Sequence, residues 1–141
     1  MNGEVLEKQL YDIATQFCKE KMPIKGKVYY RGLRPIQKNI SSYKEDVVIA
    51  FLIGSGTDIQ EGTCLLNVYT PDTQTNSGVY YANKTRCAEI ASILEHFPAF
   101  ANKLGAIYFL QDGMIQTIEE DSIKQHFISL KMKFKVLNDN Y

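Results

Sequence analysis

The chain has 141 residues, of which 45 % are hydrophobic and 23 % charged, so the composition is that of a folded domain and excludes a disordered chain. Sixteen Lys and Arg side chains balance sixteen Asp and Glu side chains, and the net charge of zero lacks the basic excess typical of nucleic-acid-binding proteins. The length predicts one domain, residues 1–141. The longest apolar run, residues 47–53, has the length of a strand, and the N-terminal residues lack the pattern of a signal peptide, so we expect no membrane segment.

The first segment predicts an amphipathic helix. Its apolar residues recur at spacings of three and four and form one stripe, which consists of Val5, Leu6, Leu10, Ile13, Ala14 and Phe17. The helix is expected to stop near Met22-Pro23, because the residue before a proline is disfavoured in the helical region. Residues 27–31 then predict a short strand, and residues 32–44 a polar connection.

Residues 46–53 and 64–70 predict two strands of a hairpin, joined by glycine-bearing turn residues 54–58. The first strand is continuously apolar, which is typical of a strand covered on both faces. Residues 71–78 are the most loop-like stretch of the chain. Since residues 71–78 contain no apolar anchor, we expect either a mobile tip that orders against a neighbouring subunit or an idle solvated connection.

The C-terminal half predicts a helix over residues 83–97, with Pro98 at or beyond its end, and a tight hairpin over residues 106–118 around Asp112-Gly113. The last strand alternates. One side should face the core and consists of Ile128, Leu130, Met132, Phe134 and Val136, and the opposite side consists of Ser129, Lys131, Lys133 and Lys135. The order α-β-β-β-α-β-β-β predicts an α+β fold with a single mostly antiparallel sheet and two main helices.

Catalytic patterns are sparse. His96 and His126 stand in no metal-binding spacing and are expected at the boundary or surface. The cysteines, Cys18, Cys64 and Cys87, form no CxxC pair, which favours inert, reduced, buried thiols in a cytoplasmic protein. We therefore expect no enzymatic activity and no cofactor or metal.

Adjacent acids occur at residues 45–46 and 119–121, and both runs are interpreted as solvated turns. A metal-dependent nuclease that uses Glu119, Asp121 and Lys124 is the least favoured hypothesis, because these residues follow the strand instead of lying on it. The glycines of Gly54-Ser55-Gly56 indicate a hairpin turn, since the downstream element is a strand and no phosphate-binding motif is complete.

Lys131, Lys133 and Lys135 form a basic stripe, which indicates a solvated sheet face or a surface for an acidic partner. Three predicted strands, in residues 47–53, 65–69 and 107–110, are apolar on both faces. Two helices cover only one face of a small sheet. The other face needs cover from loops, from the first strand or from a neighbouring subunit.

Several short motifs are similar to those of a known group. They are Arg34-Pro35, Lys44-Glu45-Asp46-Val47-Val48, Gln60-Glu61-Gly62 and Asn67-Val68-Tyr69-Thr70-Pro71-Asp72. Together with the order of elements over most of the chain, they resemble the small tail-completion, or tail-terminator, proteins of tailed bacteriophages and prophages. The motifs are structural, and the resemblance provides no catalytic residues.

The resemblance implies a compact α+β subunit that closes into a ring, often a hexamer, at the head-proximal end of the tail. There it would join or terminate the tail tube, without enzymatic activity or cofactor, in the virion or in the host cytoplasm during assembly. Its expected partners are other copies and tail-tube or head-completion proteins. The candidate interaction residues are Asp72, Thr73, Asn76, Lys131, Lys133 and Lys135. The alternative is a small intracellular protein- or nucleic-acid-binding module that uses the Lys131, Lys133 and Lys135 face, with nucleic acid the less expected partner.

Overall fold

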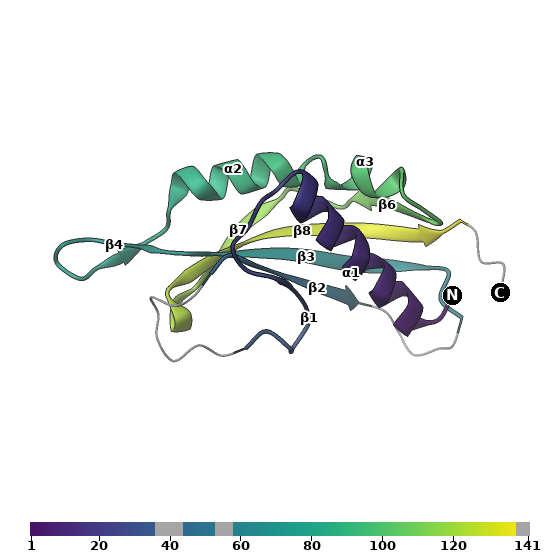
Figure 1. Ribbon diagram of the computed structural model, residues 1–141, viewed down its shortest axis with the longest axis horizontal. Coiled ribbons are helices and arrows are strands. Elements are labelled where there is room, and N and C mark those ends of the chain that lie inside the picture. Colours follow the sequence, from purple (N-terminus) through teal and green to yellow (C-terminus); the bar gives the residue numbers. More distant parts are fainter. Residues whose placement is uncertain (36–43, 53–57, 138–141) are drawn as a thin grey trace.

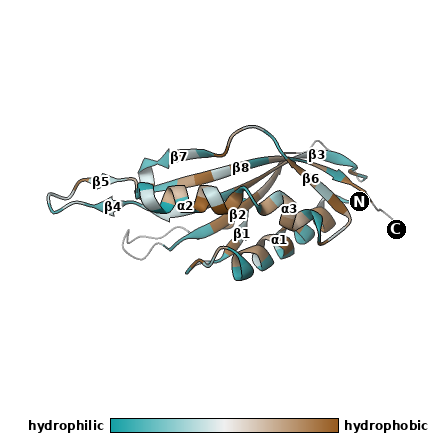
Figure 2. Cartoon of the chain, turned by 90° about the horizontal axis from the view of Figure 1, so that it is seen from above, coloured by the Kyte–Doolittle hydropathy of each residue, from teal (hydrophilic) through white to brown (hydrophobic). Residues whose placement is uncertain are grey.

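Three α-helices lie on one face of a six-stranded sheet in the computed structural model, which describes residues 1–35, 44–52 and 58–137 (Figure 1, Figure 2). The fold is therefore α+β with a mostly antiparallel sheet, as the sequence predicts. Ile53 of the second predicted strand, most of the predicted turn at residues 54–58 and the predicted tail at residues 138–141 lie outside the described residues.

The sheet is centred on two long antiparallel strands. Its order is β1 (Val28–Tyr30), β2 (Asp46–Leu52), β3 (Glu61–Pro71), β8 (Gln125–Val136) and then β6 (Ile107–Gln111) and β7 (Gln116–Glu120), which both pair with β8. Strands β1 and β2 are parallel, and the other pairs of the sheet are antiparallel. The predicted hairpin of β2 and β3 is confirmed.

Helix α1 (Gly3–Glu20) buries the predicted stripe except for Val5, which is half-buried. It begins at a capped end, because the Asn2 side chain accepts a hydrogen bond of 2.9 Å from the Val5 N–H. The Phe17 ring meets Phe97 and Phe100 edge-on, with ring centroids 5.0 and 5.2 Å from its own, which joins α1 to the helix over residues 97–102. Besides Phe17, the buried side chains of α1 are Leu6, Leu10, Ile13, Ala14 and Cys18.

The alternation of β8 is confirmed. The predicted core side is buried and consists of Ile128, Leu130, Met132, Phe134 and Val136, whereas Lys131, Lys133 and Lys135 are exposed. Because paired residues of neighbouring strands share a face, the same core face continues into β3 and β6. The three helices cover this face, so the lysines lie on the face that no described helix covers.

The predicted hairpin around Asp112-Gly113 is wrong. In the described chain β6 and β7 pair with β8 and not with each other, and both run antiparallel to it. Residues 112–115 stand opposite only residues 130–131 of β8, so they form an insertion within one long edge strand. Gly113 has φ of +86°, and the Asp112 N–H donates to the Lys131 carbonyl at 2.8 Å. The Asp-Gly pair therefore makes a bulge.

The predicted helix over residues 83–97 is two helices. Helix α2 (Lys84–Leu94) ends before Phe97, and a short helix α3 (Phe97–Asn102) follows with Pro98 in its first turn. A proline is tolerated there because the first N–H groups of a helix have no partner within it. Pro98 thus begins a helix as well as limiting the preceding one.

The loop-like segment at residues 71–78 also contains regular structure. Strands β4 (Thr73–Gln74) and β5 (Tyr80–Tyr81) form a small antiparallel hairpin outside the main sheet. The Thr75 N–H donates to the Val79 carbonyl at 2.8 Å, the Thr75 hydroxyl accepts from the Val79 N–H at 3.0 Å, and Gly78 has φ of +85°. Local turn chemistry orders this segment although it lacks an apolar anchor.

Candidate functional site

The predicted lysine stripe is part of a larger uncovered surface. Lys133 lies between Thr63 of β3 and Leu110 of β6, and Lys135 lies between Glu61 and Tyr108 on the same strands. We name this surface the open patch and define it by Leu52, Tyr108, Leu110, Lys131, Lys133 and Lys135.

Apolar side chains alternate with the lysines of the open patch. The exposed fractions are 46 % for Leu52, 45 % for Tyr108 and 56 % for Leu110. Exposed large apolar residues gathered on one face mark interaction surfaces more often than isolated ones do. The positive charge is partly compensated, because Lys131 lies 3.7 Å from the Asp112 carboxylate and Lys135 stands opposite Glu61. The open patch is thus mixed in character and not strongly basic.

The other end of this sheet face is covered from within the chain. The Arg34 guanidinium lies 4.2 Å above the Tyr69 ring, and its Nε donates to the Asp46 carboxylate at 3.0 Å. Tyr69 in turn packs against Phe127, with ring centroids 5.0 Å apart. Arg34, Tyr69 and Phe127 therefore cover one end of this sheet face from within the chain, and the open patch is the part that stays uncovered.

The candidate residues Thr73 and Asn76 belong to a second surface, and Asp72 lies at its base. We name residues 73–81, the β4–β5 hairpin with its turn, the arm; it extends away from the body of the protein (Figure 1). Asn76 at its turn is exposed and Thr73 is half-buried. The arm leaves the sheet at the end of β3 that is distant from the open patch, so the structure does not bring the two groups of candidate residues together.

Asp72 anchors the arm instead of facing solvent. Its carboxylate lies 2.6 Å from Nδ1 of His126, and its N–H donates to the Lys124 carbonyl at 3.0 Å. The Asp72 side chain is only 6 % exposed and the His126 side chain 16 %. Neither side chain is therefore available to a partner, and His126 holds the base of the arm on β8.

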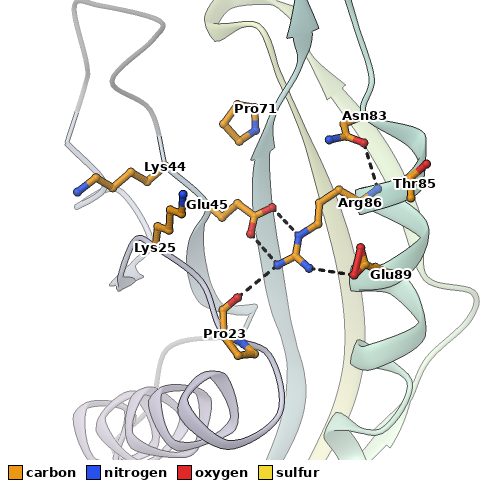
Figure 3. A pocket seen from close by; sticks show the side chains of 9 residues that line it. All are labelled: Pro23, Lys25, Lys44, Glu45, Pro71, Asn83, Thr85, Arg86 and Glu89. Carbon is orange, nitrogen blue, oxygen red and sulfur yellow. Dashed lines mark hydrogen bonds and ion pairs between the residues drawn. The ribbon is translucent and has the colours of Figure 1, made fainter.

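The pocket shown in Figure 3 has a volume of about 630 Å³ and contains a half-buried ion pair. Nε and Nη2 of Arg86 donate to the two Glu45 oxygens at 2.8 and 2.7 Å, which is the bidentate geometry of strong charge-assisted hydrogen bonds. The Thr70 hydroxyl donates to Glu45 at 2.8 Å, and Arg86 Nη1 lies 3.6 Å from Glu89. The hydrogen bond to Glu45 raises the pKa of Arg86. Arg86 is thus paired with both acids of the pocket, which is the arrangement of a structural tie, and Lys25 and Lys44 complete its charged lining.

Glu45 and Asp46 correct a sequence-based interpretation. The pair was expected as a solvated turn, yet the two side chains are 17 % and 12 % exposed and bind Arg86 and Arg34 respectively. Successive residues of a strand point to opposite faces, so each acid meets a different arginine. The partners lie 41 and 12 residues away, and no local pattern indicates them.

Replacing Arg86 by alanine is expected to lower the free energy of unfolding by about 2 kcal/mol, because it leaves the Glu45 carboxylate half-buried without its bidentate partner. The measurement is a denaturant unfolding curve. Glu89→Ala is the matched control, since Glu89 is 58 % exposed and contacts the same arginine only at 3.6 Å. Equal losses for the two variants would contradict the assigned role of Glu45.

The thiols of the three cysteines are poor nucleophiles. Cys18, Cys64 and Cys87 are free and buried. Burial raises the pKa of Cys18 to about 11 and that of Cys64 to about 12, and it also raises the pKa of Cys87, so the nucleophilic thiolate is scarce at neutral pH. Within residues 1–35, 44–52 and 58–137, no three His, Cys, Asp or Glu side chains are grouped to hold a metal ion, and no helix is long and apolar enough to cross a membrane.

A scan against protein-family models finds no match to this chain, and a search among curated proteins finds no matching relative. The functional interpretation therefore depends on the fold, on the open patch and on the arm. Sequence reasoning located the lysines of the open patch through their alternation. It missed the roles of Arg34, Arg86 and His126, because each of these residues acts through a partner that is distant in the sequence.

Proposed function

We propose that the protein is a non-enzymatic assembly subunit of a phage or prophage virion, which forms a ring at the head-proximal end of the tail and joins or terminates the tail there. The observation that carries the proposal is the presence of two different uncovered surfaces, the open patch and the arm, toward opposite ends of one small subunit. Contacts between unlike surfaces of identical subunits generate rings when the rotation between subunits closes. The motif resemblance to tail-completion proteins agrees with this assignment.

The charge of the open patch favours a protein partner over a nucleic acid. Binding of a phosphate backbone relies on several uncompensated Lys or Arg side chains. Here Lys131 is paired with Asp112, Lys135 stands beside Glu61, and the net charge of the chain is zero. The neighbouring apolar side chains fit the mixed character of a protein interface.

The proposal predicts self-association that increases with protein concentration. Light scattering and sedimentation over a concentration series should show species larger than a monomer, and electron micrographs of the largest species should show closed rings. The series extends to high protein concentration, because without the tail end as a template the isolated subunits associate more weakly. A strict monomer up to the millimolar range would contradict the ring-forming role. A loss of binding to DNA with added salt would support the alternative, nucleic-acid-binding function instead.

A further inference from the structure

The outer edge of β7 is open. The Asp112 N–H donates to the Lys131 carbonyl, so the main-chain N–H and C=O groups of Lys131 in β8 point toward the edge formed by β6 and β7. Main-chain groups alternate in direction along a strand, so those of residues 125, 127 and 129 point toward the same edge. Their partners at residues 120, 118 and 116 are therefore bonded to β8, and the N–H and C=O groups of Thr117 and Glu119 point outward. In the described parts of the chain, no strand pairs with this outer side of β7.

The neighbouring part of the same edge is closed. On β6, the Asn102 side chain accepts from the Phe109 N–H at 2.7 Å and donates to the Phe109 carbonyl at 3.0 Å. Asn102 thus occupies the positions that an added strand would take, which is one of the ways in which proteins protect sheet edges. The contrast leaves β7, a strand of five residues, as a short and defined acceptor.

The arm has the properties of a strand donor. Residues 73–81 carry no charged side chain, and Val79 and Tyr81 are 59 % and 50 % exposed. Val79, Tyr80 and Tyr81 are residues that favour strands. The arm is already folded into a hairpin in the free subunit, so docking it onto an edge requires little additional ordering. On β7, the Ile118 side chain is 37 % exposed and offers an apolar contact.

The donor must come from another copy. The arm leaves the sheet at the end of β3, on the side of β8 away from β7, and extends past the end of the sheet instead of along its own β7 edge (Figure 1). Pairing of two β7 edges with each other is disfavoured, because each edge carries Glu119 and Glu120 next to Asp121, so both partners are negatively charged. The uncharged arm causes no such repulsion. This difference in charge selects the unlike pair over the like pair.

We infer that the arm of one copy adds as a strand to the β7 edge of the next copy. The inference rests on the proposed function, since it specifies the lateral contact of the ring. That contact joins the arm to β7 and not to the open patch, which leaves the open patch for a tail-tube or head-completion protein. The contact is unlike on its two sides, which is the kind that closes into rings and does not stop at a dimer. Main-chain hydrogen bonds to residues 117 and 119 would provide most of the attraction.

Thr117→Pro tests the inference on the complete chain. Proline removes the outward N–H of Thr117, while the bonded pairs at residues 116 and 118 remain, and such positions on edge strands tolerate proline. We expect the concentration for half-assembly to rise about tenfold or more, which corresponds to the loss of one or two hydrogen bonds. Thr117→Ala keeps the N–H and should assemble like the parent. Circular dichroism melts establish that each variant is folded.

Disulfide trapping gives an independent test. Chains carrying Thr117→Cys and chains carrying Tyr81→Cys, distinguished by tags of different size, are oxidised separately and as a mixture. We expect the cross-linked heterodimer only in the mixture, because the native cysteines are buried. Absence of the cross-link in assembled material, or full assembly of folded Thr117→Pro, overturns the inference and leaves the proposed function standing. Should Thr117→Pro fail to fold, the cross-link decides. If the parent chain never assembles, the proposed function fails and the contact fails with it.

Discussion

Replacing Phe134 by alanine is expected to lower the free energy of unfolding by about 3 kcal/mol or more, through lost burial and the cavity that remains. Phe134 lies on the core face of β8, two residues before the end of the strand, and is 2 % exposed. Its ring meets Phe51 edge-on at a centroid distance of 5.0 Å, and Phe109 is its paired residue on β6. The truncation therefore affects three strands of the sheet at once.

Urea or guanidinium unfolding curves measure this loss. Lys133→Ala is the control, because Lys133 is the preceding residue of the same strand and its side chain is exposed on the opposite face. A change in secondary-structure propensity would affect both variants, whereas a loss of core packing affects Phe134→Ala alone. A loss below about 1 kcal/mol for Phe134→Ala would contradict the assigned face of β8.

The parts of the fold that the sequence predicts are those with a strong local period. In β8, the alternation of lysines with apolar residues over 127–136 defines both faces of the strand. In α1, spacings of three and four mark the buried stripe. These signals are reliable because burial acts on every residue of the element, so the pattern repeats several times within one element.

The failure at Asp112-Gly113 has a different cause. An Asp-Gly pair between two apolar runs is a strong local signal for a hairpin. Here β8 has 12 residues and bonds both runs along one edge, so the pairing across the sheet outweighs the local preference. Gly113 still uses its positive φ, of +86°, but it does so in a bulge. A single sequence contains no information about which of two possible partners a short strand takes.

The surfaces were predicted less completely than the core. The lysines of the open patch follow from alternation, whereas the coverage of the adjoining half by Arg34 depends on a contact with Tyr69 that lies 35 positions away. The arm was expected to lack structure because burial cannot order its turn. Its order comes from the Thr75 backbone and hydroxyl, which both bond to Val79. Such side-chain bonds within a turn leave only a weak trace in composition.

Shortening the arm is expected to abolish assembly while leaving the fold intact. In the variant, residues 73–77 are replaced by a short Gly-Ser link, and the contacts of Asp72 with His126 and Lys124 are retained. In the described structure β4 pairs only with β5, so its removal deletes no core contact. The melting temperature should therefore remain nearly unchanged, whereas species larger than a monomer should be lost at concentrations at which the parent chain assembles.

Thermal melts and sedimentation of the shortened variant measure the two effects separately, and the infectivity of phage that carries the variant measures the consequence for tail completion. Asn76→Ala is the matched control, because it alters an exposed side chain at the turn and leaves the strands of the arm in place. If the shortened variant unfolds, the arm contributes to the core, which would contradict the exposure of its side chains. Normal rings or normal tails with the shortened arm would show that no subunit contact depends on it. The expected combination, a folded monomer that fails to complete tails, requires that the arm acts between subunits.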